Sequence, residues 1–114
     1  MTPYTADVTM RIAEHFEANG IAVATVASFL EPSDIVVASI SESSIAEAVR
    51  QVDSDDVDAV FISCTSLRSF GILATLESEL GKPVVSSNQA FGWHLHRLAG
   101  IADPMPGLGQ LLVS

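Results

Sequence analysis

The stretch Asp58-Ala-Val-Phe-Ile-Ser63, followed by Cys64-Thr-Ser-Leu-Arg-Ser69, decides the fold of this chain. Its apolar run from Ala59 to Ile62 is rich in β-forming residues, too short for a buried helix, and preceded by turn-forming residues 53–58. We therefore predict a buried parallel strand. Ligands of parallel sheets bind beyond the carboxyl ends of the strands. The only cysteine of the chain, Cys64, thus stands where chemistry is expected.

Two interpretations of Cys64 stay open on these residues alone. Ser66 could cap a following helix, whose N–H groups and dipole would favour a thiolate beside them. An unpaired cysteine is, however, more often a small buried hydrophobic residue without a reactive role. The stretch therefore marks a candidate site and leaves its activity undecided.

Composition limits the classes of function. A chain of 114 residues is expected to form one domain around one core. Fourteen acidic residues against five basic ones give a net charge of −9, which repels phosphate backbones and anionic lipids and argues against nucleic-acid and membrane partners. No apolar run approaches the ~20 residues of a spanning helix. A single cysteine and the lack of a signal sequence predict a reducing cytoplasm.

The first half of the chain predicts two helices and one further strand. Thr5 or Asp7 caps a helix that ends at Gly20. The residues Ser41 to Ser44 offer caps for another helix, where Ser44-x-x-Glu47 fits a capping box. The inward faces of these helices are expected to carry Val8, Ile12, Ala13 and Phe16, and Ile45, Ala48, Val49 and Val52. Residues 21–27 are predicted as a strand, and residues 35–40 as a connector.

The second half of the chain also alternates helices with strands. A helix carrying Leu73, Leu76 and Leu80 ends at Gly81, and residues 82–86 form the next strand. Ser87 is expected to cap a helix over residues 88–99 whose inward residues are Phe91, Leu95 and Leu98. Strands that alternate with helices predict an α/β fold, a three-layer Rossmann-like or flavodoxin-like lobe with a short parallel sheet.

The sequence predicts no metal site and no cofactor site. His94 and His96 diverge on a helix, and no second cysteine joins them, so a zinc site is not predicted. The acidic cluster of residues 53–58 lacks the glycine and terminal glutamate of a calcium loop. Gly107-x-Gly109 follows no strand and is not a dinucleotide fingerprint.

Several linked motifs resemble the aspartate/glutamate racemase superfamily. Within it they are most similar to the branch of maleate cis-trans isomerases, arylmalonate decarboxylases and the A proteins of ectoine utilisation. The motifs cover nearly the whole chain in order, and they are Thr2-Pro-Tyr-Thr5, Ile62-Ser-Cys-Thr65 with Leu67-Arg68, Gly81-Lys-Pro-Val-Val-Ser-Ser-Asn-Gln-Ala90, Trp93-His94 and Arg97-Leu-Ala-Gly100.

The resemblance implies half of a larger architecture. Members of the family build two similar α/β lobes with the active site between them, and residues 1–114 resemble the second, carboxyl-terminal lobe only. In the family a strand leads into the Thr2-Pro-Tyr4 motif, so we expect this lobe to lack its first strand. A truncated gene, a misplaced start or an excised fragment would each give this pattern. We expect the chain to need an amino-terminal lobe or a second copy as its partner.

The resemblance also implies roles for individual residues. Cys64 matches a cysteine that donates or accepts a proton next to a carboxylate. Tyr4 matches a tyrosine that holds the substrate carboxylate. Thr65 contributes a backbone N–H that, with that of Cys64, stabilises an enolate-like oxyanion, and Ser63 joins the substrate-binding set. No cofactor is implied, and the substrate is a small mono- or dicarboxylic acid, with ectoine or dicarboxylate catabolism as the expected setting.

The chain departs from the family pattern at Ser66, Leu108 and Gln110, so the substrate stays open. Isomerisation, racemisation and decarboxylation all remain candidate reactions. The competing hypothesis from another class is a non-catalytic α/β domain, a truncation remnant or small-ligand binder whose Cys64 is idle.

Overall fold

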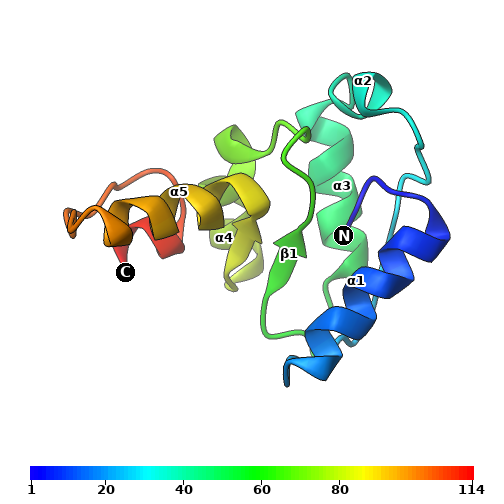
Figure 1. Ribbon diagram of the computed structural model, residues 1–114, viewed down its shortest axis with the longest axis horizontal. Coiled ribbons are helices and arrows are strands. Elements are labelled where there is room, and N and C mark those ends of the chain that lie inside the picture. Colours follow the sequence, from blue (N-terminus) through cyan, green and yellow to red (C-terminus); the bar gives the residue numbers. More distant parts are fainter.

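The computed structural model describes residues 1–114 and has an α/β architecture (Figure 1). Helices, two strands and two short 3-10 turns follow one another along the chain. In order they are α1 (Ala6–Ala18), α2 (Asp34–Val37), α3 (Glu42–Val52), β1 (Val60–Ile62), η1 (Phe70–Ile72), α4 (Leu73–Leu80), β2 (Val84–Ser86), α5 (Ser87–Leu98) and η2 (Gln110–Val113).

The sheet is short and parallel, as predicted. β1 pairs with β2 in the register Val60↔Val84, Phe61↔Val85 and Ile62↔Ser86. α4 makes the crossover between the two strands, which is the connection that parallel neighbours require. The carboxyl ends of both strands therefore meet at one edge, where Ser63 and Ser87 follow them directly.

Helices cover both faces of β1. The side chain of Phe61 points to α1, where its ring meets that of Phe16 edge to face at a centroid distance of 5.3 Å. Val60 and Ile62 point to the opposite face because side chains alternate along a strand. There they join a buried apolar core that includes Ile45 and Val49 of α3. This arrangement confirms the layered α/β fold.

The boundaries of α1, α3, α4 and α5 differ from the predictions by one turn or less, whereas the helix α2 occupies part of the predicted connector at residues 35–40. Thr5 stands at the N-cap position of α1, as expected, and Gly81 ends α4 with a left-handed φ of 67°. Ser41, and not Ser44, caps α3, because its side chain accepts the Ser44 N–H at 3.1 Å. Ser86 caps α5 in place of Ser87, because its hydroxyl accepts the Gln89 N–H. In both cases an earlier hydroxyl takes the same role.

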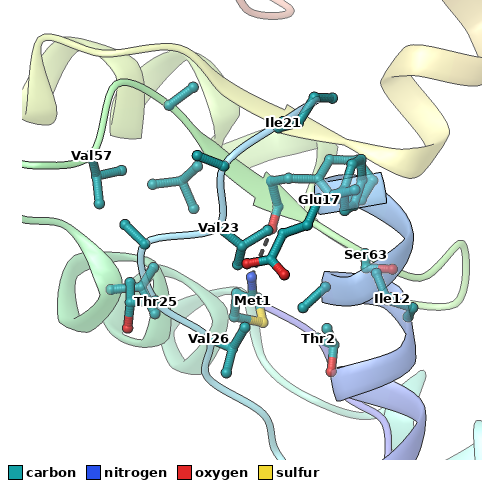
Figure 2. Close-up of a pocket in the computed structure, with 18 of the residues that line it drawn as sticks. Met1, Thr2, Ile12, Glu17, Ile21, Val23, Thr25, Val26, Val57 and Ser63 are labelled. Carbon is teal, nitrogen blue, oxygen red and sulfur yellow. Dashed lines mark hydrogen bonds between the residues drawn. The ribbon is translucent and has the colours of Figure 1, made fainter. Parts of the chain in front are cut away.

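The predicted strand at residues 21–27 is wrong. The segment has no regular secondary structure, and the nearest ladder contact is a parallel bridge between Thr2 and Ser28. A strand needs a neighbour to bond to, and no strand lies between this segment and β1. The space between them is a groove of about 500 Å³ (Figure 2).

The predicted inward face of α5 is also wrong. Phe91 is 62% exposed and Leu98 is 71% exposed, and Leu95 is exposed as well. Their helical spacing is correct, but the helix turns this face outward and buries Gln89 instead.

No helix in the structure has the length and apolarity needed to cross a membrane.

Candidate functional site

Cys64 lies two residues beyond the end of β1 and has an unusual backbone. Its φ is 109°, a left-handed value that side chains with a Cβ atom rarely adopt. Such strain is worth ~1–3 kcal/mol and gathers at functional sites. The side chain is 5% exposed. The turn therefore holds the thiol in a fixed place at the carboxyl edge of the sheet.

Backbone and hydroxyl groups around Cys64 fix this turn. The Ser66 N–H points at the Cys64 Sγ at 3.3 Å, and the Cys64 N–H donates to the Ser87 Oγ at 3.2 Å. The Asn88 side chain donates to the Thr65 carbonyl at 2.9 Å. The first residues of α5, which follow the neighbouring strand β2, thus hold the turn that carries Cys64.

Tyr4 reaches the same place from the beginning of the chain. Burial, followed by hydrogen bonding and charge interaction with Cys64 and the charge of Asp34, raises the pKa of Tyr4 to about 12, against a smaller lowering by Ser63. The phenol therefore stays protonated at neutral pH and is a donor. The Ser28 hydroxyl donates to the Tyr4 carbonyl and holds the loop in position.

The structure brings the predicted residues together. Tyr4, 60 positions before Cys64 in sequence, interacts with it, and Ser63 and Thr65 flank the cysteine. Ser63 is buried and its N–H donates to the Met1 carbonyl at 2.9 Å. Thr65 is exposed, and its N–H has no acceptor within the chain.

One expectation about this turn is wrong. Ser66 does not cap a helix, because the next helical turn begins only at Phe70. The Cys64 N–H donates to the Ser87 Oγ in this structure, and its role with the Thr65 N–H as an oxyanion donor stays a prediction. Sequence reasoning missed Ser87 and Asn88 as partners of the site. Their position directly after a parallel strand was the signal that would have found them.

The Cys64 site is distinct from the groove beside β1. The groove of about 500 Å³ borders Ser63 but includes neither Cys64 nor Tyr4, so it is a separate feature. No cluster of three or more metal-binding side chains is present in the structure. The arrangement offers a held thiol, a phenol donor and an unbonded N–H. A small anion would fit these groups.

Comparisons with known proteins identify similar chains. The model of a family described as arylmalonate decarboxylase matches residues 1–112. A maleate isomerase of Alcaligenes faecalis is 28% identical over 113 residues, which make up 98% of this chain and 45% of that protein. An arylmalonate decarboxylase of Bordetella bronchiseptica is 42% identical over 57 residues, which make up 49% of this chain and 24% of that protein.

A solved structure gives the same picture. It is Nocardia farcinica maleate cis-trans isomerase, as a cysteine-to-serine mutant with a covalently bound succinylcysteine intermediate. The TM-score is 0.94 at 26% identity, over 98% of this chain and 46% of that chain. The chain therefore spans about half the length of the relatives it matches.

Proposed function

Because this chain belongs to the arylmalonate decarboxylase family, we propose that it is one lobe of a cofactor-independent enzyme in which Cys64 moves a proton. The proton is bound to the carbon next to a carboxylate of a small dicarboxylic acid. The observation that carries this proposal is the convergence of Tyr4 and the Ser66 N–H on the strained Cys64 turn. A buried cysteine without a role would not need such a turn.

The chemistry follows from these groups. With a substrate that has a saturated carbon next to the carboxylate, a Cys64 thiolate takes the proton, so an S–H bond forms as the C–H bond breaks, and the electron pair moves into the carboxylate as an enolate. Maleate has no such C–H bond; there a cysteine sulfur adds to one alkene carbon, and the alkene electron pair moves through the neighbouring carbon into its carboxylate as the same kind of enolate, which a thiol then protonates. The added negative charge needs fixed donors. The protonated Tyr4 hydroxyl and the unbonded Thr65 N–H supply them, and the Ser66 N–H stabilises the thiolate before the proton moves.

Maleate is the first substrate to test. Two of the similar proteins are named maleate isomerases, and one of them carries a succinylcysteine intermediate. Addition of a cysteine sulfur to one alkene carbon and of a proton to its neighbour gives that species. Cys64 is suited either to add its sulfur to the alkene or to deliver the proton. A role in ectoine utilisation stays a finer prediction, as does a cytoplasmic location, which would keep the single thiol reduced.

Two competing functions have their own support. The 42% identity to the Bordetella protein, over 57 residues, favours decarboxylation of a malonate. The 5% exposure of Cys64 favours an idle, buried cysteine. A second lobe is part of the proposal because the chain spans about half the length of the relatives it matches. We propose that the second lobe supplies the remaining wall of the cleft and a second acid–base group.

The experiment fuses residues 1–114 to the half of the Nocardia farcinica enzyme that this chain does not match. Proton NMR in D₂O then follows maleate, fumarate and deuterium incorporation, and a parallel sample contains phenylmalonate. We expect fumarate from maleate. Cys64→Ser should lower the rate by ~10²-fold or more, and Tyr4→Phe by a smaller factor. Ser78→Ala, at an exposed position of α4, is the matched control and should have no effect.

Other outcomes assign the alternatives. Loss of carbon dioxide from phenylmalonate without fumarate formation would identify the decarboxylase. A folded fusion that turns over neither substrate, and whose Cys64 resists iodoacetamide in the native state, would establish the idle cysteine and overturn the proposal.

A further inference from the structure

Two consecutive residues at the start of α5 hold the cysteine turn by its backbone. The Ser87 Oγ accepts the Cys64 N–H at 3.2 Å, and the Asn88 side-chain amide donates to the Thr65 carbonyl at 2.9 Å. These bonds involve two different peptide groups, one that ends at Cys64 and one that begins at Thr65. The peptide group between them carries the Thr65 N–H, which has no acceptor within the chain. The first turn of α5 therefore fixes this unbonded donor from both sides.

The bond from Asn88 also determines where the Ser66 N–H points. The Thr65 carbonyl and the Ser66 N–H belong to one trans peptide group, which directs them to opposite sides. Asn88 holds the carbonyl side, and the N–H on the other side points at the Cys64 Sγ at 3.3 Å. A single peptide group thus connects the Asn88 amide to the sulfur.

This peptide group passes two effects to the sulfur. Donation by Asn88 to the carbonyl polarises the peptide, so the N–H on its other side becomes a stronger donor. The same bond restrains rotation of the peptide plane. Because a hydrogen bond to a charged group is stronger than one to a neutral group, the Ser66 N–H favours the Cys64 thiolate over the thiol. Without Asn88, the peptide is free to turn, and its N–H is free to leave the sulfur.

The cap of α5 leaves Ser87 and Asn88 available for this task. Ser86 caps the helix, because its hydroxyl accepts the Gln89 N–H at 3.2 Å. The next two side chains are therefore not needed to satisfy the N–H groups of their own helix. The parallel pairing of Ile62 with Ser86 places residues 87 and 88 beside residues 63–65. The register of the sheet thus determines which two residues of α5 reach the cysteine turn.

We propose that Asn88 is a positioning residue that favours the Cys64 thiolate through the peptide group between Thr65 and Ser66. The same bond keeps the Thr65 N–H in place as a donor. In this role Asn88 acts through the backbone and contacts no substrate. The inference rests on the proposed function only in that Cys64 works as a thiolate. It involves no residue of a second lobe, so this chain alone is sufficient to test it.

The charges around the thiol stay the same when a neutral residue replaces Asn88. Tyr4 is the titratable side chain that interacts with Cys64, and the charge of Asp34, at the start of α2, acts on Tyr4. Arg68 follows in the same turn and is exposed. The first turn of α5 has no acidic residue, and the basic residues of this helix stand in its last turn. A neutral substitution therefore removes a hydrogen bond and adds no charge.

The test follows thiolate formation in the 114-residue chain by ultraviolet absorbance as the pH is raised. Because Cys64 is the only cysteine, the difference from Cys64→Ser isolates its signal. Asn88→Leu keeps the branched shape of asparagine and removes the donor. We expect its thiolate to form only at about tenfold lower proton concentration, because a hydrogen bond to a charged group is lost. Asn88→Gln keeps an amide donor on a longer side chain and should recover part of this loss.

Asn19→Leu is the matched control. The Asn19 amide also donates to a carbonyl, that of His15 at 2.8 Å, but it lies at the far end of α1 from Tyr4. Its thiolate should form at the same pH as that of the unchanged chain. Urea midpoints of Asn19→Leu and Asn88→Leu separate a loss of stability from an altered thiol.

A second measurement uses the unchanged chain. NMR follows the amide protons through the same change of pH. The Ser66 amide proton should move downfield as the thiolate forms, because its acceptor becomes charged. The Ile72 amide proton, whose acceptor is the Ser69 carbonyl at 3.1 Å, should not respond.

Three results would overturn the proposal. One is a loss of stability in Asn88→Leu with no change in the pH of thiolate formation, because Asn88 would then be a structural contact only. Another is an equal change in Asn88→Leu and Asn88→Gln, which would not depend on the amide. The third is a Ser66 amide proton that does not respond to the thiolate. Maleate turnover by the fused enzyme beside any of these results would leave the proposed function in place. An inactive fusion whose Cys64 still responds to Asn88 would remove the function and leave the role of Asn88.

Discussion

At Cys64 the backbone adopts a conformation that glycine accepts more readily than any residue with a Cβ atom. We predict that Cys64→Gly is more stable than Cys64→Ala by about 1 kcal/mol, because both variants lose the thiol but only glycine relieves the strain at φ 109°. At Ser66, where φ is not positive, the same pair should rank in the opposite order. Urea midpoints of the four variants measure this. Equal stability of the two Cys64 variants would mean that the turn stores no strain.

The place of Cys64 was readable from the sequence, whereas its conformation was not. A short β-forming run followed by a polar turn puts the cysteine at the carboxyl edge of a sheet. Left-handed φ values are signalled by glycine or asparagine, and a cysteine gives no such signal. The contact with Tyr4 came from the family resemblance, since nothing local links residues 60 positions apart.

At the scale of elements, α4 holds the end of the chain through a buried carboxylate. Glu77 accepts the Val84 N–H at 3.1 Å and the Gln110 N–H at 2.8 Å, and so joins β2 to η2. We predict that Glu77→Ala lowers the free energy of unfolding by about 2–4 kcal/mol, because two buried N–H groups lose their acceptor. Ser78→Ala, the exposed neighbour, should change it by less than ~0.5 kcal/mol. Urea denaturation compares them, and similar losses in both would remove this role of Glu77.

The periodicity of apolar residues predicted the positions of the helices well, but it predicted less well which of their side chains are buried. The spacing of Phe91, Leu95 and Leu98 is helical, yet this face of α5 is exposed and Gln89 is buried. Amphipathicity identifies an apolar face but not the partner that covers it. Residues 21–27 fail for a related reason: their composition is β-like, but strand structure requires a bonded neighbour on the adjoining strand.

For the whole molecule, two perturbed groups determine how stability responds to pH. Burial lowers the pKa of the Met1 amino group below its ordinary 8.0, so the unfolded chain holds this proton more tightly than the folded chain. Stability from this group is present above about pH 8 and is lost as the pH falls through the lowered value. The pKa of Tyr4 is raised from 10.0 to about 12, so its contribution is complete below pH 10 and is lost toward pH 12.

We therefore predict that these two groups favour greatest stability between about pH 8 and pH 10. Urea unfolding across the range from about pH 6 to pH 12 measures the curve. Acetylation of the Met1 amino group should flatten the lower limb, because an amide does not titrate, and Tyr4→Phe should flatten the upper limb. Each comparison cancels the other titrating groups, including the histidines and the carboxylates of Glu17, Asp56 and Asp58, which line the same groove as Met1. If acetylation left the stability curve below pH 8 unchanged, the Met1 amino group would be exposed to water, and its pKa would not be lowered by burial.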